Sequence, residues 1–203
     1  EYIGVIILCY IIGAIPFGVI VGKLTRGIDV RQYGSGSMGM TNVLRTIGAR
    51  AALLVFVADV GKGAGAAALA GFLLTSPTAE WGQVAGGAAA VVGHCWPVFV
   101  GFRGGRGIST GFGALLLMTW PVALYSLAAF LLVLTLFRYF SLSSMVASLT
   151  MLVALIALVA VDEEPFAYLV YGLVAVPIIV FRHRGNIQRL LSGKEPKIGE
   201  KAG

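Results

Sequence analysis

The chain has 203 residues, of which 58% are hydrophobic and only 12% are charged. Soluble globular domains carry about 25% charged residues, so this chain has too few polar side chains to cover its surface in water. The composition excludes a soluble enzyme, a disordered tail and a coiled coil, and it indicates a polytopic helical membrane protein. The apolar runs are continuous rather than alternating, which argues against a membrane β-barrel.

Six apolar stretches are long enough to cross a bilayer or to contribute to a crossing. The first is too long for a signal-peptide core and has no basic segment before it. The fourth holds 30 residues without a charge. In chain order the stretches are 3–22, 51–74, 82–102, 108–137, 142–161 and 166–181.

The positions of the positive charges predict how these stretches are oriented. Fourteen of the fifteen lysines and arginines lie in alternate connections, and the other connections are acidic. Basic loops stay on the cytoplasmic side, which puts the N-terminus outside and the C-terminus inside. Arg106 and Arg138 then lie on the same side, so 108–137 crosses twice, as two short helices broken near Thr119, Trp120 and Pro121.

The expected fold is therefore all-α, a single membrane domain over 1–203 with seven transmembrane helices, two of them short, and a frayed tail after about 194. Glycine accounts for 28 residues, and pairs such as Gly18 and Gly22, or Gly82 and Gly86, predict closely packed helices. The two cysteines and two histidines are dispersed, which indicates neither a disulfide framework nor a metal site. No internal repeat is evident, which argues against an inverted-repeat transporter.

The first basic connection contains a segment rich in glycine and hydroxyl groups, residues 33–45. It matches G-x-G-x-x-G, but no strand precedes it and no βαβ unit surrounds it, so a dinucleotide site is not indicated. Glycines let several N–H groups turn toward one point, and a helix beginning near Met40 would add its N-terminus to an anion site. The alternative is a flexible polar loop. The candidate binding residues are Gly34, Ser35, Gly36, Ser37, Thr41, Asn42 and Arg45.

The second connection, within residues 93–107, combines four glycines near its end with two arginines and an intramembrane histidine. Pro97 predicts a kinked or broken helix there. The planar guanidinium of arginine suits phosphate oxygens, whereas simple anchoring of a cytoplasmic loop would explain the charges but not the glycines. The candidates are His94, Arg103, Gly104, Gly105 and Arg106.

Two later connections and one intramembrane pair add further candidates. The hydroxyls of residues 141–144 can cap a helix or donate to an anion, and both remain open. His183 and Asn186 share a helix face, with contact to lipid headgroups as the alternative. Asp59 and Lys62 either neutralise each other or serve the site. The candidates added here are Lys62, Ser141, Ser144, His183 and Asn186.

These connections are rich in cations and hydroxyls and poor in carboxylates, which favours a site for phosphate groups. Too few carboxylates are present for paired acid–base catalysis or for Mg²⁺. The H-x-x-x-x-D pattern of common acyltransferases and the aspartate-rich pattern of CDP-alcohol phosphotransferases are both absent.

The chain resembles the PlsY family, the acyl-phosphate:glycerol-3-phosphate acyltransferases of bacterial membranes. The resemblance covers nearly the whole chain and is carried by residues 34–42, 59–63, 93–107, 141–144 and 182–186. The family usually has Asn at Ser37, Ala at Met40, Lys at Arg103 and Arg106, and Glu at Gly185. These differences leave the roles of positions 37 and 185 open.

The resemblance implies that an acyl group passes from acyl phosphate to the 1-hydroxyl of sn-glycerol 3-phosphate, giving lysophosphatidic acid and phosphate. It implies seven helices in the bacterial inner membrane with the active site on the cytoplasmic side. The expected partners are the two substrates and membrane lipids, with no nucleic acid, protein partner, metal or cofactor. A phosphate-ester transporter and a membrane scaffold are the alternatives.

The two substrates both carry phosphate, so the mechanism expected for this chain must balance two anions. We expect direct attack by the glycerol hydroxyl rather than a covalent serine intermediate, and the base is either His183 or a substrate phosphate oxygen. The acyl chain is expected in a groove between helices that is open to lipid. The residues expected to act in catalysis are Ser35, Arg45, Arg106 and His183.

Overall fold

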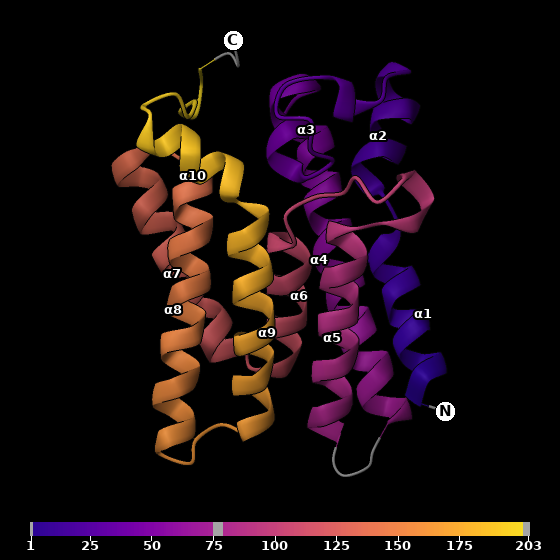
Figure 1. Cartoon of the computed structure of the whole chain (residues 1–203), viewed down its shortest axis with the longest axis vertical. Coiled ribbons are helices and arrows are strands. Elements are labelled where there is room, and N and C mark those ends of the chain that lie inside the picture. The colour runs from indigo at the N-terminus through magenta and orange to yellow at the C-terminus, as the bar shows by residue number, and fades with distance from the viewer. Residues whose placement is uncertain (1, 75–78, 201–203) are drawn as a thin grey trace.

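The structure is a computed structural model that describes residues 2–74 and 79–200. Within these ranges it consists of helices joined by loops, arranged as an upright bundle (Figure 1). The helices are α1 (Tyr2–Ala14), α2 (Phe17–Arg26), α3 (Met40–Thr46), α4 (Ala49–Leu73), α5 (Ala79–Cys95), α6 (Ile108–Met118), α7 (Trp120–Phe137), α8 (Phe140–Ala160), α9 (Phe166–Arg182) and α10 (Arg184–Leu191), with short 3₁₀ turns at Val30–Gln32 and Val98–Val100.

Several of these helices are long and apolar enough to cross a membrane. Five candidate spans are present in the described residues: α1 with α2, α4, α5 with its 3₁₀ turn, α7 and α8. A sixth arises if α9 and α10, which meet at a bend of 56°, count as one span, and α6 is a shorter apolar helix. The expected helical membrane architecture is thus present, while the count of seven and the orientation remain predictions.

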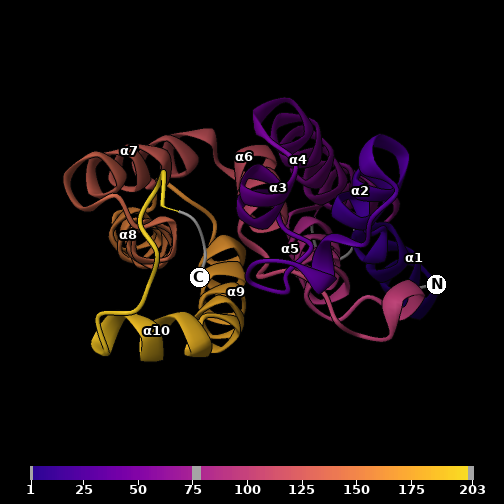
Figure 2. The ribbon, with the colours of Figure 1, turned by 90° about the horizontal axis from the view of Figure 1, so that it is seen from above.

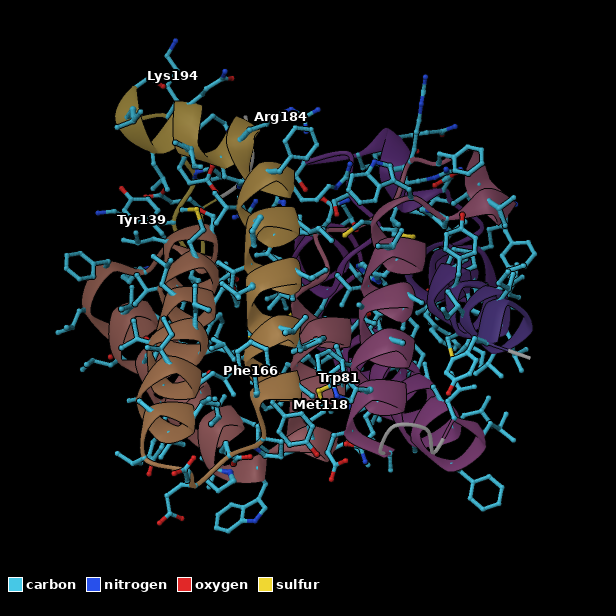
Figure 3. All side chains as sticks on the ribbon, turned by 60° about the horizontal axis from the view of Figure 1, so that its bottom comes forward. Trp81, Met118, Tyr139, Phe166, Arg184 and Lys194 are labelled. Carbon is cyan, nitrogen blue, oxygen red and sulfur yellow. The ribbon has the colours of Figure 1, made fainter. Side chains whose placement is uncertain are left out.

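The predicted break in the 30-residue apolar stretch is confirmed. Thr119 is extended, with φ −151° and ψ 94°, between the end of α6 and the start of α7. Pro121 lies in the first turn of α7, where its missing N–H costs no hydrogen bond. Met118 lies at one end of the bundle and Tyr139 at the other (Figure 3), so the chain turns back between α6 and α7.

Two other helix breaks position the site. The predicted break at Pro97 is confirmed, because α5 ends at Cys95 and the chain continues through a 3₁₀ turn into residues 101–107. The first apolar stretch is also broken, at Pro16, so that α1 and α2 are separate helices within one candidate span. Sequence reasoning treated that stretch as a single helix.

Small residues let the helices pack closely, as predicted. A Cβ atom placed on Gly82 would lie 2.5 Å from the carbonyl oxygen of Ala70, and one on Gly86 the same distance from that of Ala66. These contacts hold α4 against α5. Seen from above (Figure 2), α1 to α5 form one group and α7, α8 and α10 another, with α6 and α9 between them.

The apolar core and the chain end complete the fold. Buried residues of α4 to α9 surround Tyr171, whose hydroxyl donates to the carbonyl of Gly111 at 2.9 Å. Residues 194–200, where the sequence predicts fraying, fold back onto the bundle, and the N–H of Ile198 donates to the carbonyl of Arg138 at 2.8 Å. Residues 201–203 lie outside the described residues.

Candidate functional site

A cavity lined by polar side chains lies near the end of the bundle that carries α3 and α10. We call it the polar cavity. Its walls come from the glycine-rich loop and α3, from α4 and α5, from the segment around the start of α6, from α7 and α8, and from the residue that follows α9. The lining residues are Ser35, Ser37, Gly39, Met40, Thr41, Asn42, Asp59, His94, Arg106, Ile108, Ser109, Phe130, Phe140, Ser144 and His183.

Many of the sequence-predicted site residues meet in this cavity. They come from connections far apart in the chain. The predicted residues that line it are Ser35, Ser37, Thr41, Asn42, His94, Arg106, Ser144 and His183. Sequence reasoning weighed a site role for Asp59 without selecting it, and it missed Ser109, the hydroxyl that follows the second glycine-rich segment.

Asn42 organises the glycine-rich loop from within. Its side-chain carbonyl accepts the N–H of Ser35 at 2.9 Å, and its NH₂ group lies 2.8 Å from the carbonyl oxygens of both Val30 and Ser37. Gly34 approaches so closely that a Cβ there would lie 2.5 Å from the Asn42 oxygen, and its φ is +57°. The amide of Asn42 is therefore used inside the loop, and the donors left for an anion are the hydroxyls and the backbone.

His183 lies just beyond α9, outside the membrane-spanning segments, and is 1% exposed. Its Nδ1 lies 2.8 Å from the carbonyl of Ile179, which can only accept, so Nδ1 carries the proton. Burial and the charge of Arg106 lower the pKa of His183 to about 4. The ring is therefore neutral near pH 7, and its Nε2 holds a free lone pair.

Arg106 brings positive charge into the cavity. Burial lowers its pKa to about 10, with Glu195 opposing and Arg189 and Arg45 reinforcing that shift. The guanidinium is still protonated at neutral pH. A cation held in this way is well suited to bind phosphate oxygens.

Lys62 does not line the cavity. Its Nζ lies 2.7 Å from Oδ1 of Asp59 and donates to the carbonyl of Ile15 at 3.0 Å. Nδ1 of His94 lies 3.5 Å from the same Asp59 oxygen. Lys62 therefore pairs with Asp59 and ties α4 to the end of α1, and its contact with substrate stays a prediction, whereas Asp59 and His94 both line the cavity.

Arg45 and Arg103 lie outside the polar cavity, contrary to the expectation that both join it. Arg45 lines a neighbouring cavity with Gly34 and Phe140, and its Nη2 donates to the carbonyl of Pro196 at 3.3 Å. Arg103 is exposed and lines a separate surface pocket with Gly36. Gly104 and Gly105 are buried beside Arg106 but do not line the cavity.

Ser141 and Asn186 bind a carboxylate that sequence reasoning left unused. Ser141 Oγ donates to Oε1 of Glu195 at 2.6 Å, and Asn186 Nδ2 donates to the same oxygen at 2.7 Å. Arg189 Nε donates to Oε2 at 2.8 Å. The predicted donors thus gather around an anion, but in this structure the anion belongs to the chain itself. Ser144, in turn, donates to the carbonyl of Phe140 at 2.8 Å, so its oxygen remains only as an acceptor.

An apolar groove adjoins the polar cavity. Its walls come mainly from α6 to α9, and it shares Ile108, Phe130 and Ser144 with the cavity. Its other lining residues include Phe112, Leu115, Leu127, Met151 and Ile179. In the described residues, no three His, Cys, Asp or Glu side chains group as metal ligands.

These features define an integral membrane protein whose cationic polar cavity opens into an apolar groove, an arrangement suited to a molecule with a charged head and an apolar chain. The family model described as glycerol-3-phosphate acyltransferase matches residues 3–193. The chain therefore belongs to the glycerol-3-phosphate acyltransferase family, of the PlsY type, as the sequence resemblance indicates.

Relatives and solved structures agree with this assignment. The chain is 47% identical over 193 residues to the glycerol-3-phosphate acyltransferase of Parasynechococcus marenigrum (strain WH8102), covering 95% of this chain and 88% of the relative. It is 41% identical to glycerol-3-phosphate acyltransferase 3 of Dehalococcoides mccartyi (strain CBDB1), covering 98% and 96%. The crystal structure of PlsY in its glycerol 3-phosphate form superposes with a TM-score of 0.89 at 36% identity, covering 98% of this chain and 96% of PlsY.

Proposed function

We propose that this chain transfers an acyl group from acyl phosphate to the 1-hydroxyl of sn-glycerol 3-phosphate and releases lysophosphatidic acid and phosphate. The observation that carries the proposal is that the polar cavity and the apolar groove adjoin. They share the lining residues Ile108, Phe130 and Ser144. The cavity suits phosphate groups and the groove suits an acyl chain. PlsY has been crystallised in glycerol 3-phosphate and lysophosphatidic acid forms, which supports both substrate and product.

The chemistry requires positioning more than activation, because acyl phosphate is a mixed anhydride. The glycerol oxygen forms a bond to the acyl carbon, the hydroxyl proton passes to a base, and the acyl–oxygen bond to phosphate breaks. Catalysis then depends on alignment of the two reactants and on donors for the developing oxyanion and the departing phosphate. Neither a metal nor a cofactor enters this scheme.

The described residues divide between these tasks. Arg106 balances phosphate charge, and the hydroxyls of Ser35 and Thr41 with nearby backbone N–H groups hold phosphate oxygens. The neutral His183, with Nε2 unprotonated, is the proposed base, and a substrate phosphate oxygen is the alternative. Arg45 in the adjoining cavity attracts the anionic substrates toward the site.

The membrane arrangement is proposed from the charges and helices together. The single domain crosses the bacterial inner membrane seven times, with α1–α2, α4, α5, α6, α7, α8 and α9 as the crossings. The basic end that carries the polar cavity faces the cytoplasm, where soluble glycerol 3-phosphate is available, and the N-terminus faces outward.

Purified protein in detergent tests the function directly. It is incubated with glycerol 3-phosphate and palmitoyl phosphate, and both inorganic phosphate and lysophosphatidic acid are measured. Equal amounts of the two products are expected. Parallel reactions with acyl-CoA and acyl carrier protein identify the donor, and turnover with either of these but not with palmitoyl phosphate would refute the proposed donor. Uptake of glycerol 3-phosphate into liposomes without acylation would support a transporter instead.

A further inference from the structure

Arg182, the last residue of α9, makes a two-pronged contact with the glycine turn that precedes Arg106. Its Nε donates to the carbonyl of Gly105 at 3.0 Å, and its Nη2 donates to the carbonyl of Gly104 at 3.1 Å. The guanidinium also lies over the ring of Trp96, 5.3 Å from the ring centroid. Only arginine presents a planar fork that can bind two carbonyls and stack on an aromatic ring at once.

The same turn is held from its other side by His94. The N–H of Gly105 donates to the carbonyl of His94 at 3.0 Å. A Cβ atom on Gly105 would overlap the His94 ring, so only glycine fits there. The peptide between Gly104 and Gly105 is therefore fixed at both ends, with its carbonyl on Arg182 and its N–H on His94.

The next peptide, between Gly105 and Arg106, is oriented by Arg182 as well. The Gly105 carbonyl binds Arg182, and in a planar trans peptide the N–H of Arg106 points the opposite way. Arg182 therefore turns two successive N–H groups away from itself, toward the side where His94 lies. His94 and Arg106 both line the polar cavity.

We propose that Arg182 is a positioning residue for acyl transfer, because its contact with the Gly104 and Gly105 carbonyls sets how Arg106 enters the polar cavity. This inference rests on the proposed function, in which Arg106 holds a substrate phosphate. Arg182 does not line the polar cavity, so it acts through the turn and not by contact with substrate.

The competing explanation is that Arg182 is one of several basic residues that anchor this end of the protein at the lipid headgroups. Arg184 provides a matched control, because it is exposed, lies two residues further on as the first residue of α10, and contacts Phe181 at the end of α9 rather than the glycine turn. Its guanidinium lies 4.4 Å from the Phe181 ring centroid, and its Nη1 lies 3.4 Å from the Phe181 carbonyl oxygen. Anchoring predicts similar effects at the two positions, whereas positioning predicts an effect at Arg182 alone.

The test compares Arg182→Lys, Arg182→Gln and Arg184→Gln by steady-state kinetics with both substrates varied. Displacement of a binding group by about 1 Å can cost about 100-fold in rate, so Arg182→Gln is expected to lower kcat/KM by roughly that factor. Arg182→Lys keeps the positive charge but not the planar fork of the guanidinium. Its kcat/KM is therefore expected to be only slightly higher than that of Arg182→Gln. Arg184→Gln is expected to match the unaltered protein, and equal losses at the two positions would overturn the inference.

A double-mutant cycle with Arg106→Ala separates positioning from general damage. If Arg182 acts through Arg106, Arg182→Gln has little further effect on kcat/KM once Arg106 is gone. Additive losses would contradict the inference.

Folding is followed by thermal denaturation in detergent, and Arg182→Lys remains the informative variant if Arg182→Gln does not fold. Absence of acyltransferase activity in the unaltered protein would overturn the proposed function itself, whereas an active protein insensitive to Arg182→Gln would overturn only this inference.

Discussion

Among individual residues, His183 has the clearest chemical state. The Ile179 carbonyl fixes the proton on Nδ1, and burial beside Arg106 keeps the ring neutral. We expect His183→Gln to lower kcat by about 100-fold or more, since general acid–base catalysis contributes about 10²–10⁴, with a smaller change in the KM for glycerol 3-phosphate. Steady-state kinetics at pH 7 measure this. Full turnover by the variant would assign the proton to a substrate phosphate oxygen.

Arg106 is the cation that the structure places in the polar cavity. Removing a donor that stabilises a developing charge costs about 2.7–4 kcal/mol in other enzymes. We therefore expect Arg106→Ala to lower kcat/KM by about 100- to 1000-fold, while Arg106→Lys keeps much of the activity because a point charge remains. Exposed Arg103, in a separate pocket, supplies the control, and Arg103→Ala should have little effect. Equal losses at both positions would refute the assignment.

Residue types and spacing were enough to predict most of the polar side chains that line the cavity, because hydroxyls, glycines and cations gather in few segments of an otherwise apolar chain. They could not predict how the polar atoms pair. Asn42 looks like a free donor in sequence, yet its amide is used by the loop. Lys62 lies three residues from Asp59, and only the structure shows that the two bind each other and leave Lys62 outside the cavity.

Among the structural elements, the C-terminal segment 194–200 is held to the bundle by Glu195. Burial would raise the pKa of Glu195, but hydrogen bonds from Ser141, Asn186 and Arg189 outweigh it and lower the pKa below 4.5. A lowered pKa means that the folded state favours the ionised carboxylate. The stabilisation is therefore complete above about pH 4.5 and is lost as the pH falls through the lower folded-state value.

Protection of the backbone N–H groups of segment 194–200 against hydrogen exchange should depend on pH in the same way as the ionisation of Glu195. We expect residues 194–200 to resist hydrogen exchange at neutral pH and to lose protection, relative to α10, as the pH falls through the lowered pKa of Glu195. Glu195→Gln should weaken protection already at pH 7 and flatten the pH profile. Glu200→Gln is the control, because Glu200 is exposed and its carboxylate accepts the backbone N–H of Lys197, a residue of the same segment and not of the bundle. A pH profile unchanged by Glu195→Gln would contradict this account.

Glycines also allow helices α1 and α5 to pack closely. A Cβ on Gly13 of α1 would lie 2.5 Å from the Cα of Ala90 in α5, whereas one on Gly4 of the same helix would meet nothing within 4 Å. Overpacking costs about 1–3 kcal/mol. We expect Gly13→Ala to lower the melting temperature in detergent and Gly4→Ala to leave it unchanged or slightly raised. Equal melting temperatures for the two variants would contradict the packing.

Helix breaks show what sequence could predict about the elements. The break near Thr119 was predictable because Arg106 and Arg138 had to lie on the same side and Pro121 marked the place, and the break at Pro97 was predictable from the proline alone. The break at Pro16 was missed although Pro16 lies inside an apolar stretch and gives the same signal as Pro97. The docking of Glu195 could not be inferred, since it joins residues up to 54 positions apart that share no local pattern.

At the scale of the whole molecule, the described residues separate chemically into two ends. Tyr139, Arg184 and Lys194 lie at one end, and Trp81, Met118 and Phe166 lie at the other (Figure 3). Most cations belong to connections at the first end, close to the polar cavity, while the acidic turn at 162–164 belongs to the second. Charge distribution therefore predicts both the location of the site and the orientation of the protein.

Cysteine labelling tests that orientation, because the native thiols, Cys9 and Cys95, are both free and buried. Lys194→Cys places an exposed thiol at the basic end, and Glu163→Cys places one in the acidic turn. A membrane-impermeant maleimide should label Lys194→Cys in inverted inner-membrane vesicles and Glu163→Cys in right-side-out spheroplasts. The reverse pattern would put the polar cavity on the outer side, away from cytoplasmic glycerol 3-phosphate. Labelling of both from one side would require an even number of crossings between α8 and α10, and so would refute α9 as a single crossing.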